Sequence, residues 1–138
     1  MKKLISFAMA IAVVFVGLVC VKPRSFAAES GLLTYTVTDG KACITGTTGT
    51  ITGDFTVPAE IDGYPVVEIG NYAFYTKVNM NKHRIGNFTI SEGIIKVGDS
   101  IVPNQMVALK NIHIPSTLTE ISEISFNRSY NVESFTVN

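Results

Sequence analysis

The stretch LKNIHIPSTLTEI, residues 109–121, contains the pattern that decides the fold. It reads apolar-x-x-apolar-x-apolar, followed by a proline and a second apolar pair. Its central Ile112 has counterparts at Phe55, Phe88 and Phe135, and the successive spacings are 33, 24 and 23 residues. A period near 23 residues around one short strand is typical of a leucine-rich-repeat solenoid, in which each turn buries its apolar side chains against the next.

Stacking of these turns predicts continuous columns of apolar side chains in the core. Two columns come from the strand itself, namely Phe55, Phe88, Ile112 and Phe135, and Val57, Ile90, Ile114 and Val137. A second half-motif predicts the opposite wall, with Ile69, Val97 and Ile121 and with Phe74, Val102 and Phe126. Proline directly after the first and third strands ends the hydrogen-bond ladder there. Residues 51–138 therefore contain about three full repeats and a final strand.

A β-hairpin is predicted before the repeats. Residues 34–38 and 41–45 alternate β-branched or apolar residues around Asp39 and Gly40. Asp-Gly between such segments is a strong signal for a two-residue turn, because both turn positions need positive φ. Residues 28–50 are therefore expected to form an N-terminal hairpin cap.

Residues 63–74 and 114–121 make a more specific resemblance visible. Together they resemble the BspA-like leucine-rich-repeat family of bacterial surface proteins, and the segment 33–40 resembles the element that commonly precedes such arrays. The resemblance implies a right-handed β-solenoid with a parallel sheet. This fold is a mainly β form of the α/β-type leucine-rich-repeat superhelix, with short or 3-10 turns between its strands. It also implies an exported bacterial protein, and adhesion has been proposed for some members.

The first 27 residues have the composition of an export signal. Lys2 and Lys3 precede an uncharged stretch over 4–21, and Ser25-x-Ala27 fits a cleavage site. A retained membrane anchor is the alternative, since this stretch just reaches the span of a bilayer. Lipidation at Cys20 is disfavoured by the bulky residue before it. We expect a secreted or cell-surface protein, with cleavage near Ala27 favoured over retention.

Charge is unevenly distributed along the chain. The whole sequence has 11 basic and 11 acidic residues, and removal of the signal takes four basic ones, so the mature part has 7 − 11 = −4. A mildly acidic domain is a poor nucleic-acid binder, and no second apolar stretch is long enough to cross a membrane. Cys43 would then be the single thiol. A plain strand residue is favoured for it, and pairing between chains stays open.

Side chains between the core anchors should alternate outward onto one exposed sheet face. They form two predicted rows of candidate partner-binding residues, Asp54, Asn87, Asn111 and Ser134, and Thr56, Thr89, His113 and Thr136. Repeat proteins commonly bind partners on such a face. A merely solvated polar face is the alternative, and for any single residue it is favoured. The rows contain no aromatic hot-spot residue, so binding through them would be modest or polar.

The first repeat also contains an extra stretch after Phe74, which carries Lys77, Lys82 and Arg84. Insertions in solenoids project as loops, and these cations could meet a carboxylate or a sulfated glycan. A tolerated loop without a role is the favoured alternative.

Residue patterns for catalysis or metal binding are absent from the sequence. His83 and His113 have no Cys, Asp or Glu at metal-ligand spacing, and there is no nucleophile motif. We therefore expect no cofactor and no enzyme activity. The favoured function is recognition or adhesion, with a protein or glycan partner on a host or cell surface. The alternative is self-assembly through an uncovered C-terminal repeat, at Val132, Phe135 and Val137.

Overall fold

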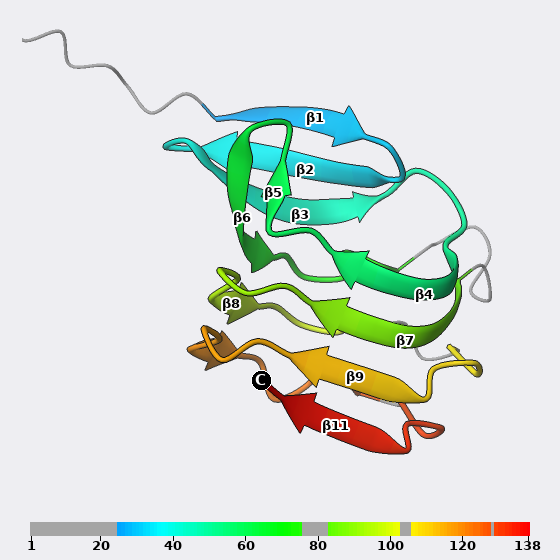
Figure 1. Ribbon diagram of the computed structural model, residues 1–138. Helices are drawn as coiled ribbons and strands as arrows, with labels where there is room; N and C mark the ends of the chain where they lie inside the picture. The colour runs from blue at the N-terminus through cyan, green and yellow to red at the C-terminus, as the bar shows by residue number, and fades with distance from the viewer. Residues whose placement is uncertain (1–24, 76–82, 103–105, 128) are drawn as a thin grey trace, which may run out of the picture.

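The computed structural model describes residues 25–75, 83–102, 106–127 and 129–138, and these form strands and turns with no helix. The strands are β1 (Phe26–Ser30), β2 (Leu33–Thr38), β3 (Lys41–Thr47), β4 (Thr52–Val57), β5 (Glu60–Ile61), β6 (Tyr64–Ile69), β7 (Arg84–Ile90), β8 (Lys96–Val97), β9 (Asn111–Ile114), β10 (Glu120–Ile121) and β11 (Ser134–Val137). The repeats coil into about four stacked turns, which run down Figure 1 from β4 to β11. None of the described segments is a helix that could span a membrane.

Two sheets run along this stack. The four-stranded sheet has the order β11-β9-β7-β4, and every pair in it is parallel. The seven-stranded sheet has the order β1-β2-β3-β6-β8-β10, with β5 paired to β6. In the four-stranded sheet Phe88 lies opposite both Phe55 and Ile112, and Ile112 lies opposite Phe135. The predicted parallel β-solenoid is therefore confirmed, with turns rather than 3-10 helices between its strands.

The core lies between the two sheets and contains the predicted columns. Phe88, Ile112 and Ile90 are fully buried, because the turns before and after each of them cover it. The Phe74 ring meets Phe88 edge-on, with centroids 5.2 Å apart. Such ring pairs add to the stability that burial of the area provides.

Three strands cover the N-terminal end of the stack. Asp39 and Gly40 join β2 to β3 with φ of 53° and 73°, and β3 continues the seven-stranded sheet by parallel pairing with β6. Strand β1 was not expected from the sequence; it pairs antiparallel with β2 and contains Ala27. The predicted boundary between signal and mature chain therefore falls inside a paired strand.

A second Asp-Gly hairpin ties this cap to the first repeat. Asp62 and Gly63 have φ of 50° and 84° and join β5 to β6. The Asp62 carboxylate accepts hydrogen bonds from the Ser30 hydroxyl (2.8 Å) and the Tyr35 hydroxyl (2.7 Å). The sequence predicts the extra length of the first repeat in the stretch after Phe74. The structure shows that this hairpin also contributes to it.

At the C-terminal end the side chains of the same columns are exposed to solvent. Phe135 is 53% exposed, Val137 70% and Ile121 50%, whereas Val132 is partly buried. Ile121 was predicted to lie in the core wall, and this prediction was wrong. Its column partner Val97 is buried, because β10 lies beyond it, while no described strand pairs with the far side of β10.

Candidate functional site

The polar face is the outward side of the four-stranded sheet, where the structure brings the two predicted rows together. The rows are in register except at Asp54, where the pairing of β4 with β7 shifts. It consists of Asp54, Thr56, Asn87, Thr89, Asn111, His113, Ser134 and Thr136. Alternation along the strands places these side chains on the opposite side from the buried columns. Sequence reasoning thus located the face, but it did not reveal how its side chains bind one another.

The first row is one continuous chain of hydrogen bonds across four strands. The Asn87 side-chain amide donates to Asp54 Oδ1 (2.7 Å), and the Asn87 backbone N–H donates to the same oxygen (3.2 Å). The Asn111 amide donates to Asn87 Oδ1 (2.6 Å), and the Ser134 hydroxyl donates to Asn111 Oδ1 (2.6 Å). Each side chain therefore donates toward the N-terminal end, and the chain finishes on a carboxylate that can only accept.

These bonds fix the geometry of the row. Asp54 is exposed, whereas Asn87, Asn111 and Ser134 are half-buried. Their rotamers are restricted before any ligand arrives, so less side-chain entropy is lost when a ligand binds. The result is a rigid polar strip with an exposed negative charge at its N-terminal end.

The second row is made of hydroxyls and one imidazole. Thr56 lies opposite Thr89, and Thr89 opposite His113. The Thr136 hydroxyl shares a hydrogen bond with His113 Nδ1. This row offers donors and acceptors with no fixed charge, which suits a polar ligand such as a carbohydrate or a peptide backbone.

The structure changes the interpretation of the basic stretch. Lys77 and Lys82 lie outside the described residues. Arg84 was expected in a loop, and this was wrong: it is the first residue of β7, and its backbone N–H donates to the Ile51 carbonyl (2.8 Å). Its side chain is exposed at the start of the four-stranded sheet, opposite Thr52.

His83, which the sequence argument had placed in the same insertion, is buried. Its Nδ1 accepts a hydrogen bond from the backbone N–H of Ile51 (3.0 Å), and its Nε2 lies 3.3 Å from the Thr47 hydroxyl. The ring also meets Phe74 edge-on. His83 therefore supports the turn between the cap and β4 and does not form part of an exposed loop.

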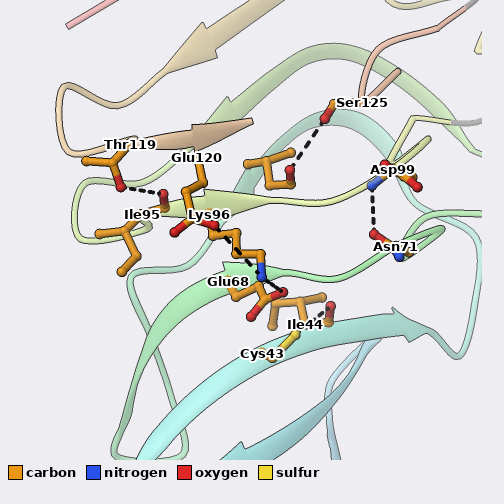
Figure 2. A network of polar contacts seen from close by, with 11 residues as sticks. Cys43, Ile44, Glu68, Asn71, Ile95, Lys96, Asp99, Thr119, Glu120 and Ser125 are labelled. Atoms are coloured by element: carbon orange, nitrogen blue, oxygen red, sulfur yellow. Dashed lines mark hydrogen bonds and ion pairs between the residues drawn. The ribbon is translucent and has the colours of Figure 1, made fainter. Parts of the chain in front are cut away.

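Sequence reasoning missed a charged column on the seven-stranded sheet. Glu68, Lys96 and Glu120 occupy equivalent positions in β6, β8 and β10. Lys96 Nζ lies 3.5 Å from Glu68 Oε1 and 4.0 Å from Glu120 Oε2, as Figure 2 shows in part. The sequence does carry a signal for this column, because its three residues alternate in charge and each directly precedes one of the aligned residues Ile69, Val97 and Ile121.

Beside this column, the turns that follow the three strands carry a second polar row. Asn71 Oδ1 accepts a hydrogen bond from the Asp99 backbone N–H (2.8 Å; Figure 2). The Ser122 hydroxyl donates to Asp99 Oδ1. Together with Lys96 and Glu120 these residues line an open groove of about 530 Å³. Because the groove is shallow and its polar groups bind one another, it lacks the convergent free groups that a catalytic pocket presents.

Cys43 lies opposite Glu68, at the N-terminal end of the charged column (Figure 2). Burial, together with the nearby Glu68 carboxylate, raises the pKa of the thiol to about 11. The thiolate is the reactive form in disulfide exchange, so at neutral pH this cysteine reacts slowly. Among the residues described, no group of three or more His, Cys, Asp and Glu side chains has the arrangement of a metal site.

Comparison with known proteins shows what this architecture resembles. The chain matches a leucine-rich cell surface protein from Faecalibacterium prausnitzii A2-165 with 24% identity and a TM-score of 0.66, over 82% of this chain and 30% of that one. It also matches a leucine-rich repeat protein from Bacteroides capillosus ATCC 29799 with 19% identity and a TM-score of 0.52, over 81% and 98% of the two chains.

These two matches show the fold. No curated protein matches the sequence. The family model for the BspA type leucine rich repeat region, in six copies, matches residues 63–138, which is more than half of the chain. The chain therefore belongs to the BspA-type leucine-rich repeat family.

Proposed function

We propose that the protein is an exported, non-catalytic recognition module that binds a protein or glycan partner through the polar face. The observation that carries this proposal is the hydrogen-bond chain from Asp54 to Ser134, which holds four polar side chains in fixed positions on a parallel sheet. A surface prepared in this way binds without first ordering its own side chains.

The composition of the face determines the kind of partner. It lacks aromatic side chains and contains amides, hydroxyls and one imidazole, with Asp54 at one end and the exposed Arg84 on the same sheet. Binding then depends on hydrogen bonds, so the partner is rich in hydroxyl, amide or ionic groups, as in a glycan or an extended peptide. The affinity of a single module is modest, and several modules on one surface would raise it by avidity.

Export supports this assignment. The basic and apolar segment before residue 25 has the composition of a signal, and one structural neighbour is a cell surface protein. A secreted or cell-surface location would put the polar face in contact with host proteins, host glycans or the envelope of neighbouring cells. Lys77 and Lys82 precede Arg84 in the sequence and would add to the positive charge of this segment.

A binding screen with matched variants tests the proposal. The exported protein is applied to an array of host and bacterial glycans and to immobilised host surface proteins. The double variant Thr89→Ala and His113→Ala removes polar groups from the face, and Thr119→Ala removes a comparable hydroxyl from the opposite sheet. We expect binding to be lost in the double variant and retained in Thr119→Ala. Equal binding by all three proteins would contradict a role for the polar face.

Self-assembly is the second candidate function, and one observation favours it. Phe135 and Val137 are mostly exposed on the last described turn beside the partly buried Val132, although their counterparts in earlier turns are buried or partly buried. A second copy that covered them would remove apolar area from water. Sedimentation velocity over a wide concentration range tests this, with Phe135→Ser as the variant expected to abolish association.

A further inference from the structure

His83 is a buried titratable side chain at the junction between the N-terminal cap and the repeats. It is 4% exposed and directly precedes β7. Residues 48–51 cross the same junction, from the end of β3 at Thr47 to the start of β4 at Thr52. Histidine is the side chain whose ordinary titration range includes mildly acidic pH, so its contacts decide what a proton does at this junction.

The hydrogen bonds of the ring assign its protonation state. The Ile51 backbone N–H donates to Nδ1 (3.0 Å), and a nitrogen that accepts a hydrogen bond carries no proton. The proton of the neutral ring is therefore on Nε2, which donates to the Thr47 hydroxyl (3.3 Å). His83 thus bridges the two ends of the linking segment in this one neutral form.

Protonation of the ring would set two donors against each other. A proton on Nδ1 points at the Ile51 N–H, so this hydrogen bond is lost. Because Ile51 and His83 are both buried, the result is a buried donor without an acceptor beside a buried charge. Each of these is costly in a protein interior. Both costs are removed when residues 48–51 separate from the start of β7 and water enters.

The groups around the ring do not stabilise a positive charge. Those that contact it from the described elements include the Thr47 hydroxyl of β3, the Ile51 N–H and the Phe74 ring, whose centroid lies 6.5 Å away. None of these groups is an anion. The neighbours of His83 in the chain are a lysine and an arginine, and the residues outside the described ranges include no aspartate or glutamate.

We propose that His83 is an acid-sensitive link between the N-terminal cap and the first repeat. The neutral ring holds Ile51 in place, and the Ile51 carbonyl in turn accepts the Arg84 N–H (2.8 Å). When the ring takes up a proton, residues 48–51 and the first pair of the β4–β7 ladder, Thr52 and Arg84, open. The ladder from Phe55 and Phe88 onward stays closed, because it is held by the packing of the core.

The opening would extend to the polar face, because Asp54 and Arg84 lie near the starts of β4 and β7. Binding through this face would then weaken at mildly acidic pH. This consequence rests on the proposed function, whereas the opening itself needs no ligand. A failure of the opening and a failure of the binding screen are therefore distinguishable.

Amide hydrogen exchange of the exported protein between pH 7 and pH 5 tests the link. The sequence contains two histidines, His83 and His113, and carboxyl groups ordinarily titrate below this range. The lowered carboxyl pKa values of Asp62 and Glu92 take these two groups further from it. NMR titration of the imidazole nitrogens in the same samples shows the pH at which each ring takes up its proton.

Two variants separate the histidines. In His83→Asn the side-chain Oδ1 takes the place of Nδ1 and accepts from the Ile51 N–H at every pH. His113→Gln removes the other titrating ring, which lies on the polar face. The internal reference is the Lys110 amide, which donates to the Gly86 carbonyl in the interior of the same sheet (2.8 Å).

We expect the protection of the Ile51 and Arg84 amides, corrected for intrinsic exchange, to fall about tenfold for each pH unit below the titration of His83. The fall should be the same in His113→Gln and absent in His83→Asn, and the Lys110 amide should stay protected in all three proteins. An equal fall in His83→Asn overturns the proposal. So does a wild-type His83 ring that takes up a proton while the Ile51 amide stays protected, or that stays neutral until the whole protein unfolds.

Discussion

The first and the last described turns of the solenoid differ in how their apolar side chains are covered. At the N-terminal end, three antiparallel strands close the stack, and the side chains of Tyr35 in β2 and Ile44 in β3 are buried. At the C-terminal end, Phe135 and Val137 of the last turn face solvent. A repeat buries its apolar row against its neighbours, so a row with a described turn on one side only stays partly exposed.

The comparison is sharpest within one column. Phe88 and Phe135 occupy equivalent positions in the same motif, yet Phe88 is fully buried and Phe135 is 53% exposed. Burial in this fold therefore depends on the presence of a turn on both sides and not on the motif alone. Five predictions test how far this difference between interior and end extends.

The largest effect is expected from truncation of the same residue type at the two places. Phe88→Ala removes a ring that contacts Phe55 and Phe74, and should lower the free energy of unfolding by about 3–5 kcal/mol. Phe135→Ala should lower it by about 1 kcal/mol, because the ring is already half in water. Denaturant unfolding of both variants measures the difference. Equal losses would show that the last turn is as well covered as the interior.

The spacing between turns gives the next effect. A Cβ atom at Gly98 would collide with Asn71 Oδ1 and lie 2.8 Å from the Asn71 backbone nitrogen. Gly98→Ala should therefore cost about 1–3 kcal/mol through overpacking. At the equivalent position of the next turn, Ser122→Gly loses a hydrogen bond to Asp99 and should cost about 1 kcal/mol. Thermal unfolding of the two variants tests whether the spacing between turns is tighter at Gly98 than at Ser122.

The link between Asp62 and the cap should make the N-terminal end sensitive to pH. Hydrogen bonds from Tyr35 and Ser30 lower the pKa of the Asp62 carboxyl, so this contribution to stability is present above the usual carboxyl pKa and is lost as pH falls through the lowered value. We expect a loss smaller than that in Gly98→Ala. The unfolding midpoint measured from pH 6 to pH 2 should fall further in the wild type than in Asp62→Asn.

The carboxyl pKa of Glu92 is also lowered, by hydrogen bonds from Ser116 and Thr117, but it titrates in both proteins and cancels in this comparison. At alkaline pH the Asp62 hydrogen bond raises the pKa of Tyr35 to about 12. This second contribution is present below pH 10 and is lost as pH rises toward 12. A Tyr35→Phe variant should lack that alkaline loss, and its persistence there would contradict the role of the hydroxyl.

The smallest effect is expected in the charged column. Lys96→Ala removes an exposed cation between Glu68 and Glu120, and should change stability by about 1 kcal/mol or less, with the change reduced further in high salt. Unfolding at two salt concentrations measures it. A larger, salt-independent loss would mean that the Lys96 side chain contributes through packing of its methylene groups.

The repeat columns could be predicted from the sequence because they depend on spacing alone, and the register of Phe55, Phe88, Ile112 and Phe135 follows directly from it. The Asp62-Gly63 hairpin carried the same signal as Asp39-Gly40, but β5 has two residues and shows no alternation to support a strand. Strand β1 could not be predicted from the sequence, because its residues overlap the end of the export-signal pattern.

The candidate site was predictable in position but not in its internal bonding. Alternation placed Asn87 and Asn111 on one face, whereas the direction in which each amide donates depends on distances between strands. The burial of His83 was likewise invisible, because the residues that surround it, such as Thr47 and Phe74, are distant in sequence.

The direction of the hydrogen-bond chain on the polar face bears on how such an array can lengthen by duplication of its repeats. Asn87 and Asn111 each donate to one neighbour and accept from the other, so a copy of either turn could be inserted between them and the chain would continue. Asp54 accepts but cannot donate when it is ionised. A copy of the first turn placed in the interior would set its carboxylate against the acceptor oxygen of the turn before it. Duplication is therefore tolerated from the middle of the array, and the first turn is bound to remain first.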